Sequence, residues 1–204
     1  MIITASQHEA LSSHLFATDS MGALHRAPTA VHTAIAALIE PTDINGSHCE
    51  YAQLDPVRWR VWATTATHLA HTEVKFENED TYDAEEEEAR LDPLRQAKRP
   101  LAYRTSPARH DLVAAWTRPL LGILRVKADG IDRDYDAVGN ESAFRLQGIT
   151  VEFADGTIVP SEGRLRIPMQ SQRAEGDSDR WEDFIEAIRK GSPYHTLELG
   201  TRQS

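Results

Sequence analysis

The sequence predicts an α+β protein with mostly antiparallel strands, and three observations support this class. Apolar and polar residues alternate on both sides of Asp155-Gly156, which predicts a hairpin, and a helix with one apolar face follows from Asp179. A second run of alternation, from Val57 to Phe76, predicts another hairpin. Residues 1–45 have helical spacing instead. The chain of 204 residues is long enough for one domain with extensions.

The N-terminal region, residues 1–45, is expected to be a helical extension. Ser6 and Glu9 have the spacing of a capping box, in which each residue satisfies a backbone N–H at the start of a helix. Pro28 is suited to the first turn of a second helix, which Pro41 would end. Turn-forming residues follow, so the strand-rich part is expected to begin near residue 46.

The hairpin between Val57 and Phe76 is rich in β-branched and aromatic residues. In its first strand Trp59 and Trp62 fall on opposite faces, because side chains alternate along a strand. One of the two is expected in the core. An outward-facing Trp62 would suit a protein interface, where exposed aromatic side chains act as anchors.

Residues 77–107 interrupt the pattern with charge and proline and are interpreted as a long loop or insertion. Residues 77–92 hold nine acids and one base, whereas residues 93–127 hold eight bases and one acid. Two adjacent stretches of opposite sign can neutralise each other within a fold. The insertion is either a long loop or, over residues 84–98, a solvated helix.

The remaining elements are assigned from residue type and spacing. Residues 110–117 are expected to form a short helix, and residues 121–126 a strand. Residues 128–130 are interpreted as a turn, and residues 132–142 as a polar loop.

The hairpin at Asp155-Gly156 is expected to use a two-residue turn with positive φ at both central positions. Leu165 begins a further short alternation before the helix. That helix is expected to start at Asp179 and to end near Gly191 and Pro193. Its apolar face comprises Trp181, Phe184, Ile185 and Ile188. Residues 192–204 are interpreted as a tail.

The order of these elements carries a family resemblance. The segments that carry it are residues 58–71, 121–126 and 149–159 and the terminal helix with Trp181 and Phe184. In this order the chain resembles a pleckstrin-homology-like (PH-like) module of the bacterial or GRAM type over residues 46–191. The resemblance implies a seven-stranded bent barrel capped by the C-terminal helix, which binds peptides, proteins or lipid headgroups.

The chain departs from that family in its N-terminal extension and its charged insertion. Over residues 58–71 it also has only the two bases Arg58 and Arg60, where the family carries a run of basic residues that cradles inositol phosphates.

Composition favours a cytoplasmic protein. The single cysteine, Cys49, excludes an intramolecular disulfide, and no signal peptide or membrane-spanning apolar run is read. A net charge of −10 argues against nucleic-acid binding, which needs a basic surface. The basic stretch 93–127 is the one electropositive candidate surface.

No motif predicts catalysis, a cofactor or a metal. Asp132, Asp134 and Asp136 have the spacing that opens a calcium loop, but Ala137 and Ala143 replace its glycine and glutamate. His68 and His71 would point to opposite faces of a strand, which separates them as zinc ligands. An enzyme would need dispersed residues that sequence motifs do not reveal, so an enzyme of unknown class ranks as the last hypothesis.

We therefore expect an interaction module that binds a protein, with self-association through the N-terminal helices as one form of this hypothesis. The alternative is binding of an anionic ligand or phospholipid headgroup through the basic stretch. The predicted binding residues are Arg95, Lys98, Arg99, Arg104 and Trp62.

Overall fold

A computed structural model describes seven segments of the chain. They are residues 3–18, 24–52, 56–76, 110–135, 141–159, 165–166 and 177–193. Within them, three α-helices and ten strands form an α+β fold whose strand pairs are all antiparallel, as the fold-class prediction required. None of the described helices is long and apolar enough to cross a membrane.

The N-terminal region contains two helices and a small hairpin. The elements are α1 (Ala5–His14), β1 (Phe16–Thr18), β2 (Leu24–Arg26), α2 (Thr29–Ala36) and the 3-10 helix η1 (Pro41–Asp43). The capping box of α1 is formed by Thr4 and Gln7, two residues before the predicted pair. The sequence Thr-x-x-Gln satisfies the same two backbone N–H groups as Ser-x-x-Glu.

The central sheet has four strands in the order β3-β4-β5-β6. Their bounds are β3 (Gly46–Ala52), β4 (Arg58–Thr64), β5 (His68–Phe76) and β6 (His110–Pro119). The predicted hairpin of residues 57–76 is confirmed as β4 and β5, with Trp62 opposite His71. Both faces of this sheet are covered, and this is why Trp59 and Trp62 are both buried although they point in opposite directions.

The outer sheet is built on a long hairpin of β7 (Ile123–Tyr135) and β8 (Glu141–Phe153). The two short strands β9 (Ile158–Val159) and β10 (Leu165–Arg166) pair with β8. The 3-10 helix η4 (Leu120–Gly122) joins β6 to β7, so the chain passes directly from the central sheet to the outer one.

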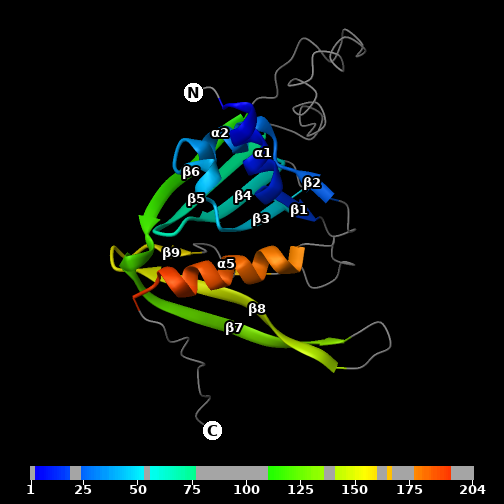
Figure 1. Cartoon of the computed structure of the whole chain (residues 1–204), viewed down its shortest axis with the longest axis vertical. Helices are drawn as coiled ribbons and strands as arrows, with labels where there is room; N and C mark the ends of the chain where they lie inside the picture. Colours follow the sequence, from blue (N-terminus) through cyan, green and yellow to red (C-terminus); the bar gives the residue numbers. More distant parts are fainter. Residues whose placement is uncertain are drawn as a thin grey trace.

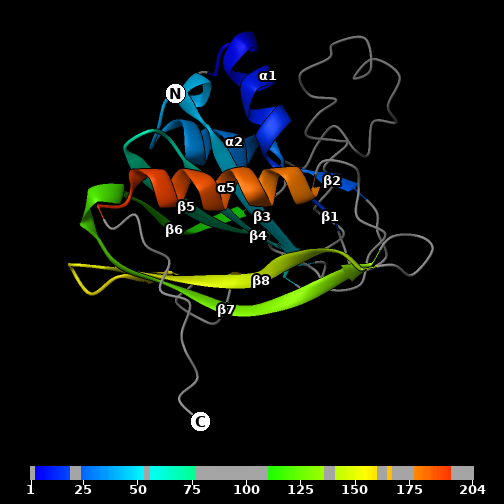
Figure 2. The same ribbon diagram turned by 60° about the horizontal axis from the view of Figure 1, so that its bottom comes forward.

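Helix α5 (Asp177–Gly191) lies beside the central sheet, on the side that faces the outer sheet (Figures 1 and 2). It packs mainly against β3, with further contacts to β4 and η4. The predicted apolar face of this helix is confirmed, because Trp181, Phe184 and Ile188 are each at most 4% exposed. The helix starts two residues before the predicted Asp179.

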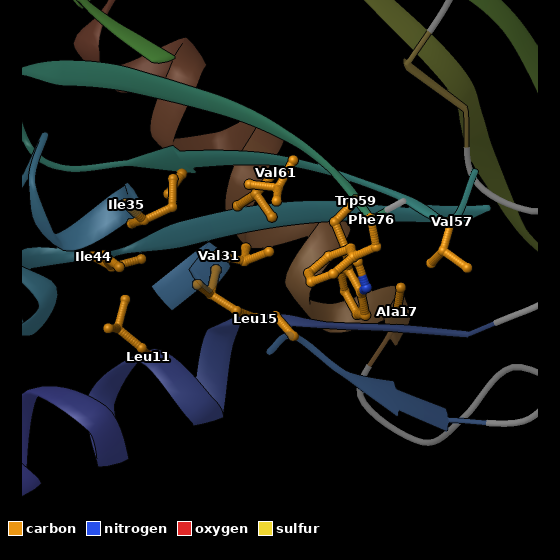
Figure 3. Close-up of a cluster of buried hydrophobic side chains, with 13 residues drawn as sticks. Leu11, Leu15, Ala17, Val31, Ile35, Ile44, Val57, Trp59, Val61 and Phe76 are labelled. Carbon is orange, nitrogen blue, oxygen red and sulfur yellow. The ribbon is translucent and has the colours of Figure 1, made fainter. Parts of the chain in front are cut away.

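The two faces of the central sheet belong to two separate hydrophobic cores. The first core joins the sheet to α1, α2 and β1, and Figure 3 shows Leu11, Val31 and Ile35 of the two helices gathered in one cluster with Trp59 and Val61 of the sheet. The second core joins the opposite face to α5 and the outer sheet, and it includes Trp62, Phe153 and Phe184. The fold is therefore layered, with the N-terminal helices, the central sheet, and α5 with the outer sheet in succession (Figure 2).

Several predictions of local structure were wrong. Residues 110–117 form part of strand β6 and not a helix, because their backbone pairs with β5 from His68 to Phe76. Residues 128–130 lie inside β7 as an irregular stretch of its pairing with β8 and not as a turn. The described residues of the predicted loop at 132–142 are strand, since β7 runs to Tyr135 and β8 starts at Glu141, and residues 136–140 lie outside the description.

The turn at Asp155-Gly156 also differs from its predicted form. Only Gly156 has a positive φ, of 84°, among the described residues. The Phe153 carbonyl accepts from the N–H of Gly156 at 3.0 Å and the Phe153 N–H donates to Thr157 at 2.8 Å. This pattern is a type I turn followed by a left-handed glycine, which gives a three-residue connection.

The predicted barrel is not closed in the part of the chain that the structure describes: the strands form two four-stranded sheets and the two-stranded β1-β2 pair. The insertion 77–107 and the tail beyond Pro193 lie outside the described residues. Residues 1–45 hold strands as well as helices, and their apolar side chains share the first core with the central sheet.

Gly46 lets α5 approach the central sheet at backbone distance. A Cβ at this position would lie 2.7 Å from Cα of Phe184, whereas a Cβ on Gly122 would meet only side-chain atoms at 3.7 Å. We expect Gly46→Ala to lower the free energy of unfolding by about 1–3 kcal/mol, because the helix must move away from β3. Gly122→Ala, the control, should change it by about 0.5 kcal/mol or less. Urea unfolding of both variants measures the difference, and equal stabilities would contradict this account of Gly46.

Candidate functional site

Four ring side chains form a row across the inner face of the central sheet, the face that belongs to the second core. His48, Trp62, His71 and Trp116 come from β3, β4, β5 and β6 and lie opposite one another in register. Successive ring centroids are 5.7, 4.9 and 5.2 Å apart. Cross-strand neighbours of this kind are in contact because opposite Cβ atoms lie about 5 Å apart. We call these four residues the aromatic row.

The aromatic row connects the central sheet to its covering elements. The ring of His48 lies 4.9 Å from that of Trp181 on α5, in an edge contact. At the other end, Trp116 makes an edge contact with Phe153 of β8 at 6.5 Å. Because both contacts use ring edges against ring faces, they orient the helix and the outer sheet on the central sheet as well as exclude water.

His71 holds the centre of the row through a backbone hydrogen bond. Its Nδ1 lies 3.0 Å from the carbonyl oxygen of Val61 on β4, so the neutral ring donates from this nitrogen. Burial is the largest influence on this ring and lowers the pKa of His71 below its ordinary value of 6.5, against the opposing effect of the Val61 carbonyl. His71 is therefore a neutral, structural ring at pH 7.

A second row, of charged residues, lies beside the aromatic row on the same face. Arg60 is paired in register with Glu50 on β3 and Glu73 on β5. Its Nε lies 3.2 Å from Glu73 and its Nη1 3.7 Å from Glu50, while Nη1 of Arg58 lies 3.3 Å from Glu73. The two arginines are thus matched by two carboxylates, which leaves the row without a net charge.

These two rows do not provide a catalytic arrangement or a metal centre of three or more protein ligands. Among the described residues, no three His, Cys, Asp or Glu side chains are grouped closely enough to hold a metal ion. The charged side chains of the inner face are engaged with one another, and the rings are stacked. The ion pairs and ring contacts of the inner face therefore hold the strands and their covering elements together.

The exposed apolar residues offer a different kind of site. Leu121 is 75% exposed, Leu124 53% and Ile158 49%. Leu121 is in η4, Leu124 is in an irregular step at the start of β7, and Ile158 is on β9. The N–H of Ala154 donates to the carbonyl of Gly122 at 2.9 Å, which joins η4 to the β8–β9 turn. Figures 1 and 2 both show η4 and this turn at one end of the molecule, and we call these three residues the apolar end.

The backbone beneath the apolar end is anchored on both sides. Leu120, which precedes the exposed Leu121, and Ile123, which precedes the exposed Leu124, are at most 1% exposed and belong to the second core. Nε of Arg118 lies 2.7 Å from Oδ2 of Asp155, and its guanidinium lies 5.4 Å from the centroid of Trp116. The backbone that carries the exposed side chains is therefore already ordered. This favours binding, because little conformational entropy of the backbone is lost when a partner binds.

The structure places the predicted binding residues as follows. Arg95, Lys98, Arg99 and Arg104 lie outside the described residues. Trp62 is 2% exposed in the second core, so it is not the outward-facing anchor that the alternation allowed. The outer sheet and α5 cover the face on which Trp62 lies. Because these elements are distant in sequence, the alternation of residues in β4 does not indicate that this face is covered.

The apolar end was not singled out from the sequence. Residues 121–126 were predicted as a strand, and neither Leu121 nor Leu124 was among the predicted binding residues. The signal that was present is Pro119, which ends β6 and starts η4, since proline cannot donate to a sheet ladder.

Comparisons with protein-family models, with curated proteins and with solved structures give no match.

The buried ring of His71 predicts a pH dependence of stability. Because its pKa is lowered in the folded protein, the unfolded chain takes up a proton first as the pH falls below about 6.5. The stabilising contribution of the neutral ring is complete above that pH and is lost as the pH falls towards the folded pKa. We expect His71→Gln, whose amide retains a donor for Val61, to have a flatter plot of unfolding free energy against pH between about 6.5 and 5. Chemical unfolding at several pH values measures the two slopes, and parallel curves would exclude this role.

Proposed function

We propose that this chain is a protein-binding module that contacts its partner through the apolar end. The proposal includes a PH-like organisation of residues 46–191. Its support is the order of the elements: the four antiparallel strands of the central sheet, then the meander of β7, β8 and β9, then a helix packed on the first sheet. The proposed location is the cytoplasm, which the single free cysteine, Cys49, favours.

The observation that carries the proposal is the exposure of three large apolar side chains at one end of the fold. Burying a leucine side chain contributes about 1.5–3 kcal/mol. This free energy is not gained at the apolar end of the isolated chain, and it would be gained when a partner covers these side chains. Exposed apolar groups surrounded by polar residues are a feature of protein interfaces. Here the surrounding side chains include Arg125 and Glu152, whose ion pair at 3.8 Å lies next to Leu124 and Ile158.

The charges near the apolar end favour a protein partner over an anionic ligand. Three bases of the stretch 93–127 are described with side chains, namely Arg118, Arg125 and Lys127. Arg118 is engaged by Asp155 and Arg125 by Glu152. A phosphate or a lipid headgroup would have to compete with these carboxylates, whereas an apolar surface of a partner protein would not.

The N-terminal helices are a less suitable contact for self-association. Leu11 on α1 and Val31 and Ile35 on α2 are fully buried in the first core. Their apolar faces are thus already used against the central sheet. We therefore propose a different protein, with an apolar surface of its own, as the partner of the apolar end.

The test replaces the exposed leucines and leaves the fold unchanged. We expect the double variant Leu121→Asp, Leu124→Asp to lose the partner protein in quantitative pull-downs from the native organism, because charge at the centre of an apolar contact opposes its burial. With the purified partner, the double variant should weaken binding by about 2 kcal/mol or more, which is about thirtyfold in Kd. Titration calorimetry measures this change.

The matched control is Leu24→Asp, since Leu24 is 52% exposed on β2, which lies across the molecule from η4 (Figure 1). It should bind the partner as the unaltered chain does. Thermal unfolding of both variants checks that the fold is retained. Equal partner recovery with the double variant would reject the apolar end as the interface. Cosedimentation with anionic vesicles that falls steeply with salt would favour the anionic-ligand alternative.

A further inference from the structure

His32 on α2 is a buried imidazole without a hydrogen-bond partner. It is 2% exposed, and neither its Nδ1 nor its Nε2 has a partner in the part of the chain that the structure describes. Most buried polar side-chain atoms in proteins are satisfied, so a ring with two unsatisfied nitrogens requires an explanation, such as a bound water or ion. Replacing a hydrogen bond to water by none costs about 1–3 kcal/mol for each buried group.

A second imidazole faces this ring from the neighbouring helix. The ring centroids of His8 on α1 and His32 on α2 lie 4.9 Å apart, with 59° between the ring planes. His8 is half-buried, so the pair is reached from solvent on the His8 side. The Oγ of Ser12 lies 3.4 Å from Nδ1 of His8, which leaves Nε2 of His8 as the nitrogen available to a ligand.

The separation of the two rings matches that of two imidazoles on one metal ion. With a zinc–nitrogen bond of about 2.0–2.1 Å, a ring centroid lies about 3.2 Å from the metal. Two such rings are then about 4.5 Å apart at a ligand–metal–ligand angle of about 90° and about 5.2 Å apart at the tetrahedral angle. The observed 4.9 Å lies between these two values.

We propose that His8 and His32 form a two-histidine site for Zn²⁺ between α1 and α2. Two imidazole nitrogens suit zinc and its neighbours among the transition metals, whereas Ca²⁺ and Mg²⁺ prefer oxygen ligands. The described residues supply no third His, Cys, Asp or Glu ligand, so water completes the coordination. Contact of Ser12 with His8 fixes the orientation of that ring, as partners outside the coordination sphere do in metal sites.

Zinc at this site would join the two N-terminal helices. The helices meet over the first core, to which Leu11 of α1 and Val31 of α2 both belong. A metal that binds the folded pair and not the unfolded chain adds to the free energy of unfolding in proportion to the logarithm of its concentration. The site is separate from the apolar end, and its existence does not depend on the proposed function.

The experiment is a titration of the full chain with Zn²⁺ by calorimetry, together with thermal unfolding in Zn²⁺, Mg²⁺ or EDTA. We expect one equivalent of zinc to bind and to raise Tm, and we expect EDTA to reverse the rise. Mg²⁺ should have no such effect. His8→Ala should weaken zinc binding by about tenfold or more, because one of two protein ligands is lost. His8 is half-buried, so this variant leaves the core of α2 in place.

The control is His68→Ala, since His68 is an exposed histidine on β5. It should bind zinc as the unaltered chain does. Nitrogen-15 spectra of the imidazoles give a second readout, in which zinc should shift one nitrogen of His8 and one of His32. Absence of zinc binding, unchanged binding in His8→Ala, or shifts confined to other histidines would each overturn the proposal.

Discussion

The contact on which the rest of this structure depends is the approach of helix α5 to strand β3 at Gly46. The backbone of Phe184 comes so close to this glycine that any side chain there would overlap with it. With the helix at this depth, Trp181 and Phe184 reach the ring of His48, and the second core closes over Trp62. Since the outer sheet meets the central sheet through this same core, its position follows from the depth of the helix.

Polar contacts of Arg180 then hold the N-terminal part of α5 in place. Nη1 of Arg180 donates to the carbonyl oxygens of His14 and Phe16 at 2.9 and 3.0 Å, and its guanidinium lies over the ring of Phe16 at 3.2 Å. The carbonyl of His14 also accepts from Ser47 at 2.9 Å. The end of α1 is a point at which the N-terminal helices, β3 and α5 are held together. The two cores are therefore coupled, although the central sheet separates them.

Elements that carry their own periodicity could be predicted, and those defined by distant partners could not. The hairpin of β4 and β5 and the apolar face of α5 follow from local spacing. Leu112, Val113 and Trp116 have spacing that also fits a helix, and only pairing with β5 makes them a strand. Of the predicted site residues, Trp62 was expected to face outward, but it is buried because the layer that covers its face is formed by residues more than fifty positions away. The exposure of Leu121 and the facing rings of His8 and His32 depend equally on how separate elements pack, so periodicity alone does not reveal them.

The link between Arg180 and the carbonyls of His14 and Phe16 has a consequence for the order of folding. The two partners of this link are separated by 164 to 166 positions in the chain. During synthesis, which adds about 5–20 residues per second, β3 to β6 emerge well before α5. In that interval the inner face of the central sheet, with Trp62 and His48, has no helix to cover it. The aromatic side chains of this face therefore gain their helical cover only at the end of synthesis, and the link from Arg180 to the end of α1 can form only after α5 has been made.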